Sequence, residues 1–333
     1  MTDRDVHLPV AAQPSVETIV EQTRLAEDLG YDRAWLPETW GRDAVTALTM
    51  MGDRTETIGV GSSIMNVYSR SPGLLGQTAV TQQEVSDGRF RLGIGPSGPI
   101  VIESWHGEEF GNPLKRAREA VEIIKLVTTG QEVDYEGRVF DLSGFRLRSE
   151  PPEVRPPVDV AAMGPKAVEM AGRFADGWHA TMFTPDGLRD RLGDFEHGGD
   201  LGDQDRDEQR TVLSLTACAL DDGERARTLA RQHAAFYVGG MGTYYRDSLA
   251  RQGYEDRAHE IAAAWGSGNH EAAAELVDDE MLDDLAAAGT PEQARQRLLA
   301  FEEIDGLDAV AVAFPRGADR GDVEETMRAL APA

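Results

Sequence analysis

The part of the sequence that decides the fold lies between residues 57 and 97. It begins with the apolar run TIGVGSSIM (57–65), continues with SPGLLGQTAVTQQEVS (71–86), turns at Asp87-Gly88 and ends with FRLGIGPS (90–97). The first and last runs have the composition of buried β-strands, and the middle run has the length and residue types of a helix. A strand, a helix and a second strand in this order predict a βαβ unit with parallel strands.

The same alternation continues towards both ends of the chain. Helical patterns follow each apolar run, as expected for repeated βα units. Eight strand–helix pairs are typical of a closed (β/α)8 TIM barrel, so we assign the chain to the α/β class with that fold. The eight strands are expected at residues 6–12, 33–38, 57–65, 90–97, 157–163, 177–183, 211–220 and 307–314.

The length leaves room for segments beyond the barrel. A (β/α)8 barrel needs about 250 residues, and the chain has 333. We expect insertions after strands four and seven, namely a hairpin at 132–142 and a helical insertion without a clear strand at about 239–289. A short helix at 187–196 is expected to end in an acidic, glycine-rich loop at 198–208. No domain boundary is apparent, so residues 1–333 are predicted to form a single barrel domain.

The charge balance excludes several classes of partner. The chain has 59 acidic residues against 33 basic ones, for a formal net charge of −26, and no dense Lys/Arg run. Nucleic acids and anionic membranes need a basic surface, and no stretch of 18 apolar residues would span a bilayer. The N-terminus lacks the pattern of a secretory signal, and the single cysteine, Cys218, excludes an internal disulfide. We therefore expect a cytoplasmic protein.

Lysine is unusually rare in this acidic chain. Only three of the basic residues are lysines, namely Lys115, Lys125 and Lys166. At molar salt the Debye length is about 3 Å, so the repulsion within an acidic surface is largely screened. Acidity together with scarce lysine predicts adaptation to a high-salt cytoplasm. An ordinary acidic protein is the alternative.

Two glycine-containing segments occur at expected strand ends. Residues 93–98 (GIGPSG) formally match a dinucleotide fingerprint, but Pro96 interrupts the turn and no helix opens directly after Gly98. Glycines at a strand end also let the backbone pass close to a ligand. Residues 163–167 (MGPKA) end a strand and open a helix, where free N–H groups and Lys166 suit a phosphate. A plain strand-to-helix turn is the alternative there.

Several polar side chains are expected at the end of the barrel where active sites lie. Glu38, Thr39 and Trp40 follow strand two, and His106 follows strand four. His179 lies within strand six and points towards the barrel mouth in one interpretation, with a structural role as the alternative. The seven histidines show no metal-ligand spacing, so no metal site is expected. No Gly-x-Ser-x-Gly motif is present to anchor a hydrolase triad.

Short motifs in a fixed order run along nearly the whole chain. They are LAEDLGY (25–31), GRD (41–43), TIGVG (57–61), NVY (66–68), RSP (70–72), DGR (87–89), GPKA (164–167), ADG (175–177) and AGTP (288–291). This ordered set resembles the bacterial luciferase-like superfamily of (β/α)8 barrels, and more closely its branch that uses coenzyme F420, a deazaflavin. Within that branch the chain is similar to the methylenetetrahydromethanopterin reductases.

The resemblance implies a cofactor site at the strand ends. Residues 63 and 64 match a bulge with a non-prolyl cis peptide that supports the deazaflavin ring, and residues 164–167 match the loop near the cofactor phosphate. Glu38 and His106 are the candidates for a catalytic general acid. The residues expected to bind the cofactor are Thr39, Trp40, Ser63, Ile64, Asn66, Ser97, Gly98, Met163, Gly164, Pro165, Lys166 and Ala167.

The chain departs from the reductases at two substrate-side positions. They carry an acid in strand one where this chain has Pro9, and another at the end of strand four where it has Gly98. The resemblance therefore supports the cofactor class more strongly than the substrate.

These observations favour an F420-dependent oxidoreductase that transfers a hydride between C5 of the deazaflavin and a small organic substrate. A methylene-tetrahydropterin-type C1 carrier is one such substrate. An FMN-dependent luciferase-like monooxygenase is the first alternative, and a non-catalytic barrel that binds a flavin or deazaflavin is the second. The resemblance also implies a homodimer or a larger homo-oligomer.

Overall fold

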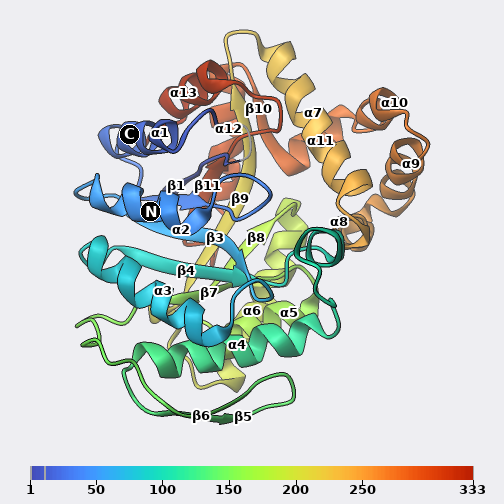
Figure 1. Ribbon diagram of the computed structural model, residues 1–333. Coiled ribbons are helices and arrows are strands. Elements are labelled where there is room, and N and C mark those ends of the chain that lie inside the picture. Colours follow the sequence, from blue (N-terminus) through green and yellow to red (C-terminus); the bar gives the residue numbers. More distant parts are fainter. Residues whose placement is uncertain (1, 11–12, 333) are drawn as a thin grey trace.

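The computed structural model describes residues 2–10 and 13–332. Its centre is a closed barrel in which every neighbouring pair of strands is parallel, and β9 closes the ring by pairing with both β8 and β11. The predicted TIM barrel is thus confirmed (Figure 1). The barrel strands are β1 (Asp3–His7), β2 (Arg33–Leu36), β3 (Gly59–Asn66), β4 (Phe90–Gly95), β7 (Val158–Ala161), β8 (Gly177–Thr181), β9 (Arg210–Ala219) and β11 (Ala309–Ala313).

Helices surround the barrel (Figure 1). Most of them begin at a residue whose side chain accepts a backbone N–H of the first turn, such as Ser15, Ser71 and Thr184, which fixes where each helix starts. The helices that follow barrel strands are α1 (Val16–Asp28), α2 (Ala44–Asp53), α3 (Pro72–Val85), α4 (Pro113–Thr128), α5 (Pro165–Phe174), α6 (Pro185–Leu201), α7 (Gly223–Gly240) and α13 (Arg320–Ala329), and α12 (Pro291–Glu302) precedes the last barrel strand.

Further elements lie outside the barrel and the helices around it. The antiparallel hairpin of β5 (Val133–Glu136) and β6 (Asp141–Phe145) lies between α4 and β7. In Figure 1, α8, α9 and α10 lie together on one side of the barrel, beyond α7. This group between α7 and α12 consists of α8 (Thr243–Leu249), α9 (Glu255–Gly266), α10 (His270–Glu275), α11 (Asp279–Leu285) and the short strand β10 (Ala286–Gly289).

Three expectations about where strands and helices lie were wrong. Strand one begins at Asp3 rather than at residue 6, because polar side chains at its inward positions conceal the strand pattern; residues 11 and 12 of the expected strand lie outside the described part of the chain. The segment expected to lack a strand contains β10, which pairs with residues 216–219 of β9.

The third correction concerns the glycines near residue 198. Helix α6 continues through Gly198 and Gly199 to Leu201, where we expected a loop. A Cβ on Gly198 would lie 2.0 Å from the carbonyl oxygen of Glu169 in α5, and one on Gly172 would lie 2.0 Å from that of Phe195 in α6. Because these glycines have no side chain, α5 and α6 can approach closely. Here glycine serves the packing between two helices and does not mark a turn.

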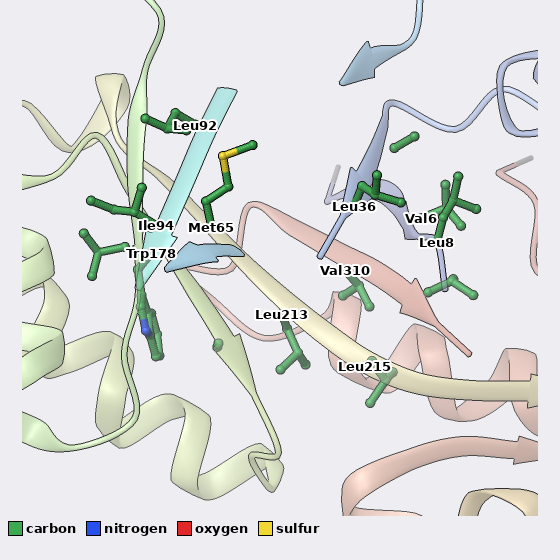
Figure 2. Close-up of a cluster of buried hydrophobic side chains, with 14 of the residues drawn as sticks. Val6, Leu8, Leu36, Met65, Leu92, Ile94, Trp178, Leu213, Leu215 and Val310 are labelled. Carbon is green, nitrogen blue, oxygen red and sulfur yellow. The ribbon is translucent and has the colours of Figure 1, made fainter. Parts of the chain in front are cut away.

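The main hydrophobic core lies between the barrel and its helices. Figure 2 shows outward-facing strand side chains of this core, including Val6, Leu36, Leu92 and Leu213. A second cluster packs β9, α7 and the helices α8–α11 together. Because side chains alternate along a strand, the residues between these apolar positions point into the barrel. No helix among the described residues is long and apolar enough to cross a membrane.

Candidate active site

Several charged side chains lie inside the barrel. Arg91 donates to both carboxylate oxygens of Asp159, at 2.6 and 2.9 Å. Burial alone would raise the pKa of Asp159, but the charge of Arg91 and the hydrogen bond from His179 outweigh it and hold that pKa well below its usual range. Asp5 accepts from the Trp35 indole at 2.7 Å and from Arg210, and burial raises the pKa of this carboxyl despite the nearby arginines.

Strand β3 has an irregularity that faces the mouth of the barrel. Its register with β4 shifts between Ser62 and Met65, and the Ser63–Ile64 peptide bond is cis, at the position that the resemblance indicates. The Ser62 hydroxyl donates to the Gly93 carbonyl at 2.8 Å and accepts from the Gly93 N–H at 3.0 Å. The Ile64 carbonyl accepts from the backbone N–H of Glu38 at 3.2 Å. We call residues 62–65 the β3 bulge.

Two histidines hold Ser63 from inside the barrel. His7 Nε2 lies 2.8 Å from the Ser63 carbonyl oxygen, and His179 Nδ1 lies 3.0 Å from the Ser63 hydroxyl. His179 Nε2 lies 3.3 Å from Asp159. The Trp35 ring meets the His179 ring edge-on, with centroids 4.4 Å apart. Burial inside the barrel lowers the pKa of His7 to about 4. His7 is therefore neutral at pH 7.

The predicted residues Asn66 and His106 are in contact. Asn66 Oδ1 accepts the backbone N–H groups of Tyr68 and Ser69, at 3.0 and 2.7 Å. The Asn66 amide nitrogen must then be the group that faces His106 Nε2, 3.3 Å away, so this ring nitrogen accepts. A neutral His106 consequently carries its proton on Nδ1. His106 ends the π-helical turn at Val101–His106, which follows a turn in which Ser97 has a positive φ of 57°.

The predicted candidate Glu38 has an arginine partner. Both of its carboxylate oxygens accept from Arg70 Nη1 at 2.6 Å, and its side chain is only 9% exposed. Arg70 also reaches Asp43, which caps α2. This geometry makes Glu38 a fixed anion that connects the end of β2 to the segment after β3. Its neighbours Thr39 and Trp40 lie on the same loop, Thr39 half-buried and Trp40 47% exposed.

The predicted phosphate loop lies at the start of α5. Gly164 is the N-terminal cap of this helix and contributes no side-chain hydrogen bond, and a Cβ there would meet no atom within 4 Å. Met163 and Ala167 are half-buried, and Pro165 is exposed. The Lys166 ammonium binds Glu169 at 2.7 Å, and its side chain is 78% exposed. The cation that we expected at this loop is thus already paired.

Sequence reasoning missed part of this arrangement. His7 and Asp159 were not expected at a site, and His179 was an open alternative. A detectable signal was the polar residue at every second position of β1, because such residues on a barrel strand share the inward face. Among residues 2–10 and 13–332, no three His, Cys, Asp or Glu side chains are placed to hold a metal ion.

Two known proteins are similar to this chain over most of its length. A 5,10-methylenetetrahydromethanopterin reductase of Archaeoglobus fulgidus is 31% identical over 300 residues, which cover 89% of each chain. A Mycobacterium tuberculosis protein provisionally named as a coenzyme F420-dependent oxidoreductase is 29% identical, over 87% of this chain and 89% of that protein.

The fold has a close counterpart among solved structures. The coenzyme F420-dependent tetrahydromethanopterin reductase of Methanopyrus kandleri matches with a TM-score of 0.84 and 22% identity, covering 98% of this chain and 97% of that one. The family model described as luciferase-like monooxygenase matches residues 2–307. The chain belongs to the luciferase-like monooxygenase family.

Proposed function

We propose that this protein is an F420-dependent oxidoreductase that transfers a hydride between C5 of the deazaflavin and a small organic substrate. The observation that carries the proposal is the β3 bulge at the mouth of the barrel, in a chain whose relatives include a methylenetetrahydromethanopterin reductase at 31% identity. Those relatives favour a methylene-tetrahydropterin-type C1 carrier as the substrate.

The residues at the mouth fit a flat ring with an anionic tail. Ile64 is half-buried and lies over Gly95, where a Cβ would come within 3.2 Å of its side chain. The bulge therefore offers an apolar surface for a ring. Helix α5 begins without a side-chain cap at Gly164, so the start of this helix is open to an anion. Lys166 is close in sequence, and its pairing with Glu169 would have to yield for it to contact a phosphate.

These features divide the predicted residues into two groups. Coenzyme F420, when bound, supplies the hydride chemistry, while the protein supplies binding, orientation and exclusion of water. The ring group consists of Thr39, Trp40, Ser63, Ile64, Asn66, Ser97 and Gly98. The phosphate group consists of Met163, Gly164, Pro165, Lys166 and Ala167.

Of the two candidates for a general acid, the geometry favours His106. Its Nε2 accepts from Asn66, which leaves the proton of the neutral ring on Nδ1, a group able to donate. Both oxygens of Glu38 already accept hydrogen bonds from Arg70. We assign Glu38 to fixing the loop that carries Thr39 and Trp40.

Turnover tests the proposal. The absorbance of the oxidised deazaflavin is followed while a reduced C1 carrier is offered as hydride donor, in buffer with molar KCl. Loss of that absorbance, dependent on enzyme and carrier, is the expected result. The family description favours an FMN-dependent monooxygenase as second candidate. Oxygen consumption with reduced FMN, without turnover of F420, would support that reaction instead. Light scattering of the same sample tests the expected homodimer or larger homo-oligomer.

A further inference from the structure

The β3 bulge is held by strands that are not its neighbours. β3 pairs with β2 and β4. The two histidines that contact Ser63 come from β1 and β8, which lie two strands away on one side and three on the other. Both side chains therefore reach Ser63 across the interior of the barrel. One holds the carbonyl and the other holds the hydroxyl of the same residue.

We propose that His7 and His179 are positioning residues that fix the β3 bulge, and with it the surface that Ile64 presents at the barrel mouth. This inference rests on the proposed function, in which that surface supports the deazaflavin ring. It gives the barrel interior a part in the reaction beyond packing, because a shift of Ser63 would move Ile64, the next residue in the chain.

The hydrogen bonds leave one position for each proton. The Ser63 carbonyl only accepts, so His7 Nε2 carries a proton and donates it. The Asp159 carboxylate, ionised beside Arg91, also only accepts, so His179 Nε2 carries a proton. With that single proton on the ring, Nδ1 of His179 accepts from the Ser63 hydroxyl. A series of hydrogen bonds thus runs from Arg91 through Asp159 and His179 to Ser63, with each donor matched to an acceptor.

The burial of these hydrogen-bonded groups restricts the orientations that their side chains can adopt. Asp159 is fully buried and His179 is 4% exposed. Water is therefore a poor substitute partner for either group, and a rotated ring would leave a buried polar atom without a hydrogen bond. The Trp35 ring, which packs perpendicular to the His179 ring, further limits rotation. A side chain that only filled space would need none of these polar contacts.

The test compares substitutions at Ser63 in the full-length protein. Ser63→Ala removes the hydroxyl and leaves His179 in its packing, whereas Ser63→Thr keeps the hydroxyl. Affinity for F420 and the absorption spectrum of the bound coenzyme are measured for each. We expect Ser63→Ala to bind about 10-fold more weakly, equivalent to ~1.4 kcal/mol, with an altered spectrum. Ser63→Thr should bind more tightly than Ser63→Ala because it keeps the hydroxyl. The control His197→Gln, on the exposed surface of α6, should stay near wild type.

Equal affinity and an unchanged spectrum for Ser63→Ala would overturn the inference. Failure of the wild-type protein to bind F420 would instead count against the proposed function. The proton positions are measured independently of any coenzyme, by 15N NMR of the histidine rings in the apoprotein, with His7→Gln and His179→Asn used for assignment. We expect a neutral His7 ring protonated at Nε2, and a His179 ring with a proton on Nε2. A His179 ring without a proton on Nε2 would overturn the inference on its own.

Discussion

Replacing Asp159 by Asn should destabilise the protein strongly, because this carboxylate is the counter-ion inside the barrel. It is fully buried and accepts from Arg91 at 2.6 and 2.9 Å. Asn has nearly the same size but no charge, so Arg91, whose side chain is 12% exposed, loses its ionic partner. Removal of one member of a buried ion pair costs about 3–5 kcal/mol. We expect about 3 kcal/mol, since the amide oxygen still accepts one hydrogen bond.

Urea unfolding at pH 7 in molar KCl, followed by circular dichroism, measures this loss. The thermal midpoint should fall by roughly 5 °C in parallel. The matched control is Asp186→Asn, because Asp186 pairs with Arg189 on the surface and its side chain is 97% exposed. That control should stay within about 0.5 kcal/mol of wild type. A loss below about 1 kcal/mol for Asp159→Asn would refute the role of Asp159 as an ionic anchor.

The pH dependence gives the same prediction a second test. The pKa of Asp159 in the folded protein lies well below its unfolded value, so its contribution to stability is complete above the unfolded pKa near 4. That contribution is lost as the pH falls through the folded pKa. The difference between wild type and Asp159→Asn should therefore be equal at pH 7 and pH 5, and should shrink only below about 4. A difference that already shrinks between pH 7 and pH 5 would contradict the assignment.

Three further outcomes follow from the structure. Gly93→Ala would place a Cβ 2.1 Å from the Ser62 carbonyl oxygen. We therefore expect the free energy of unfolding in urea to fall by about 3 kcal/mol. A fall of less than about 1 kcal/mol would contradict this packing. His7 has a pKa of about 4 when folded and about 6.5 when unfolded. The unfolded state therefore binds the extra proton, and the free energy of unfolding should decrease as the pH falls from 6.5 to 4. His7→Gln should reduce this dependence on pH, and an unchanged dependence would argue against a buried neutral ring. Dialysis from molar KCl to low salt should abolish most of the secondary structure seen by circular dichroism, whereas an unchanged spectrum would rule out the halophilic interpretation of the net charge of −26.

The barrel was predictable because its signal is repeated. Apolar runs alternate with helical patterns along the chain, and each pair supports the same topology. The ends of strands and helices were harder to predict where one residue type has two structural roles. Glycine usually marks a turn, but Gly198 allows α6 to approach α5. Polar residues usually mark the surface, but Asp5 and His7 of β1 point into the barrel, so the strand was expected to begin three residues too late.

The rim of the site was easier to predict than its interior. Residues at strand ends, such as Ser63, Asn66 and Gly164, stand in recognisable short motifs. His7 and Asp159 have no motif, and they become partners of the site only when strands far apart in sequence close into a ring. The partners that decide how Glu38 and Lys166 behave, Arg70 and Glu169, likewise depend on side-chain placement that spacing alone does not give.

Titration of the purified apoprotein with coenzyme F420 and, separately, with FMN tests the central claim most directly. The buffer contains molar KCl, and binding is followed by the absorbance and fluorescence of each coenzyme. We predict saturable binding of F420, with much weaker binding of FMN, because the bulge and the open start of α5 would receive the ring and the anionic tail of the deazaflavin. Tight binding of FMN with no binding of F420 would contradict the account.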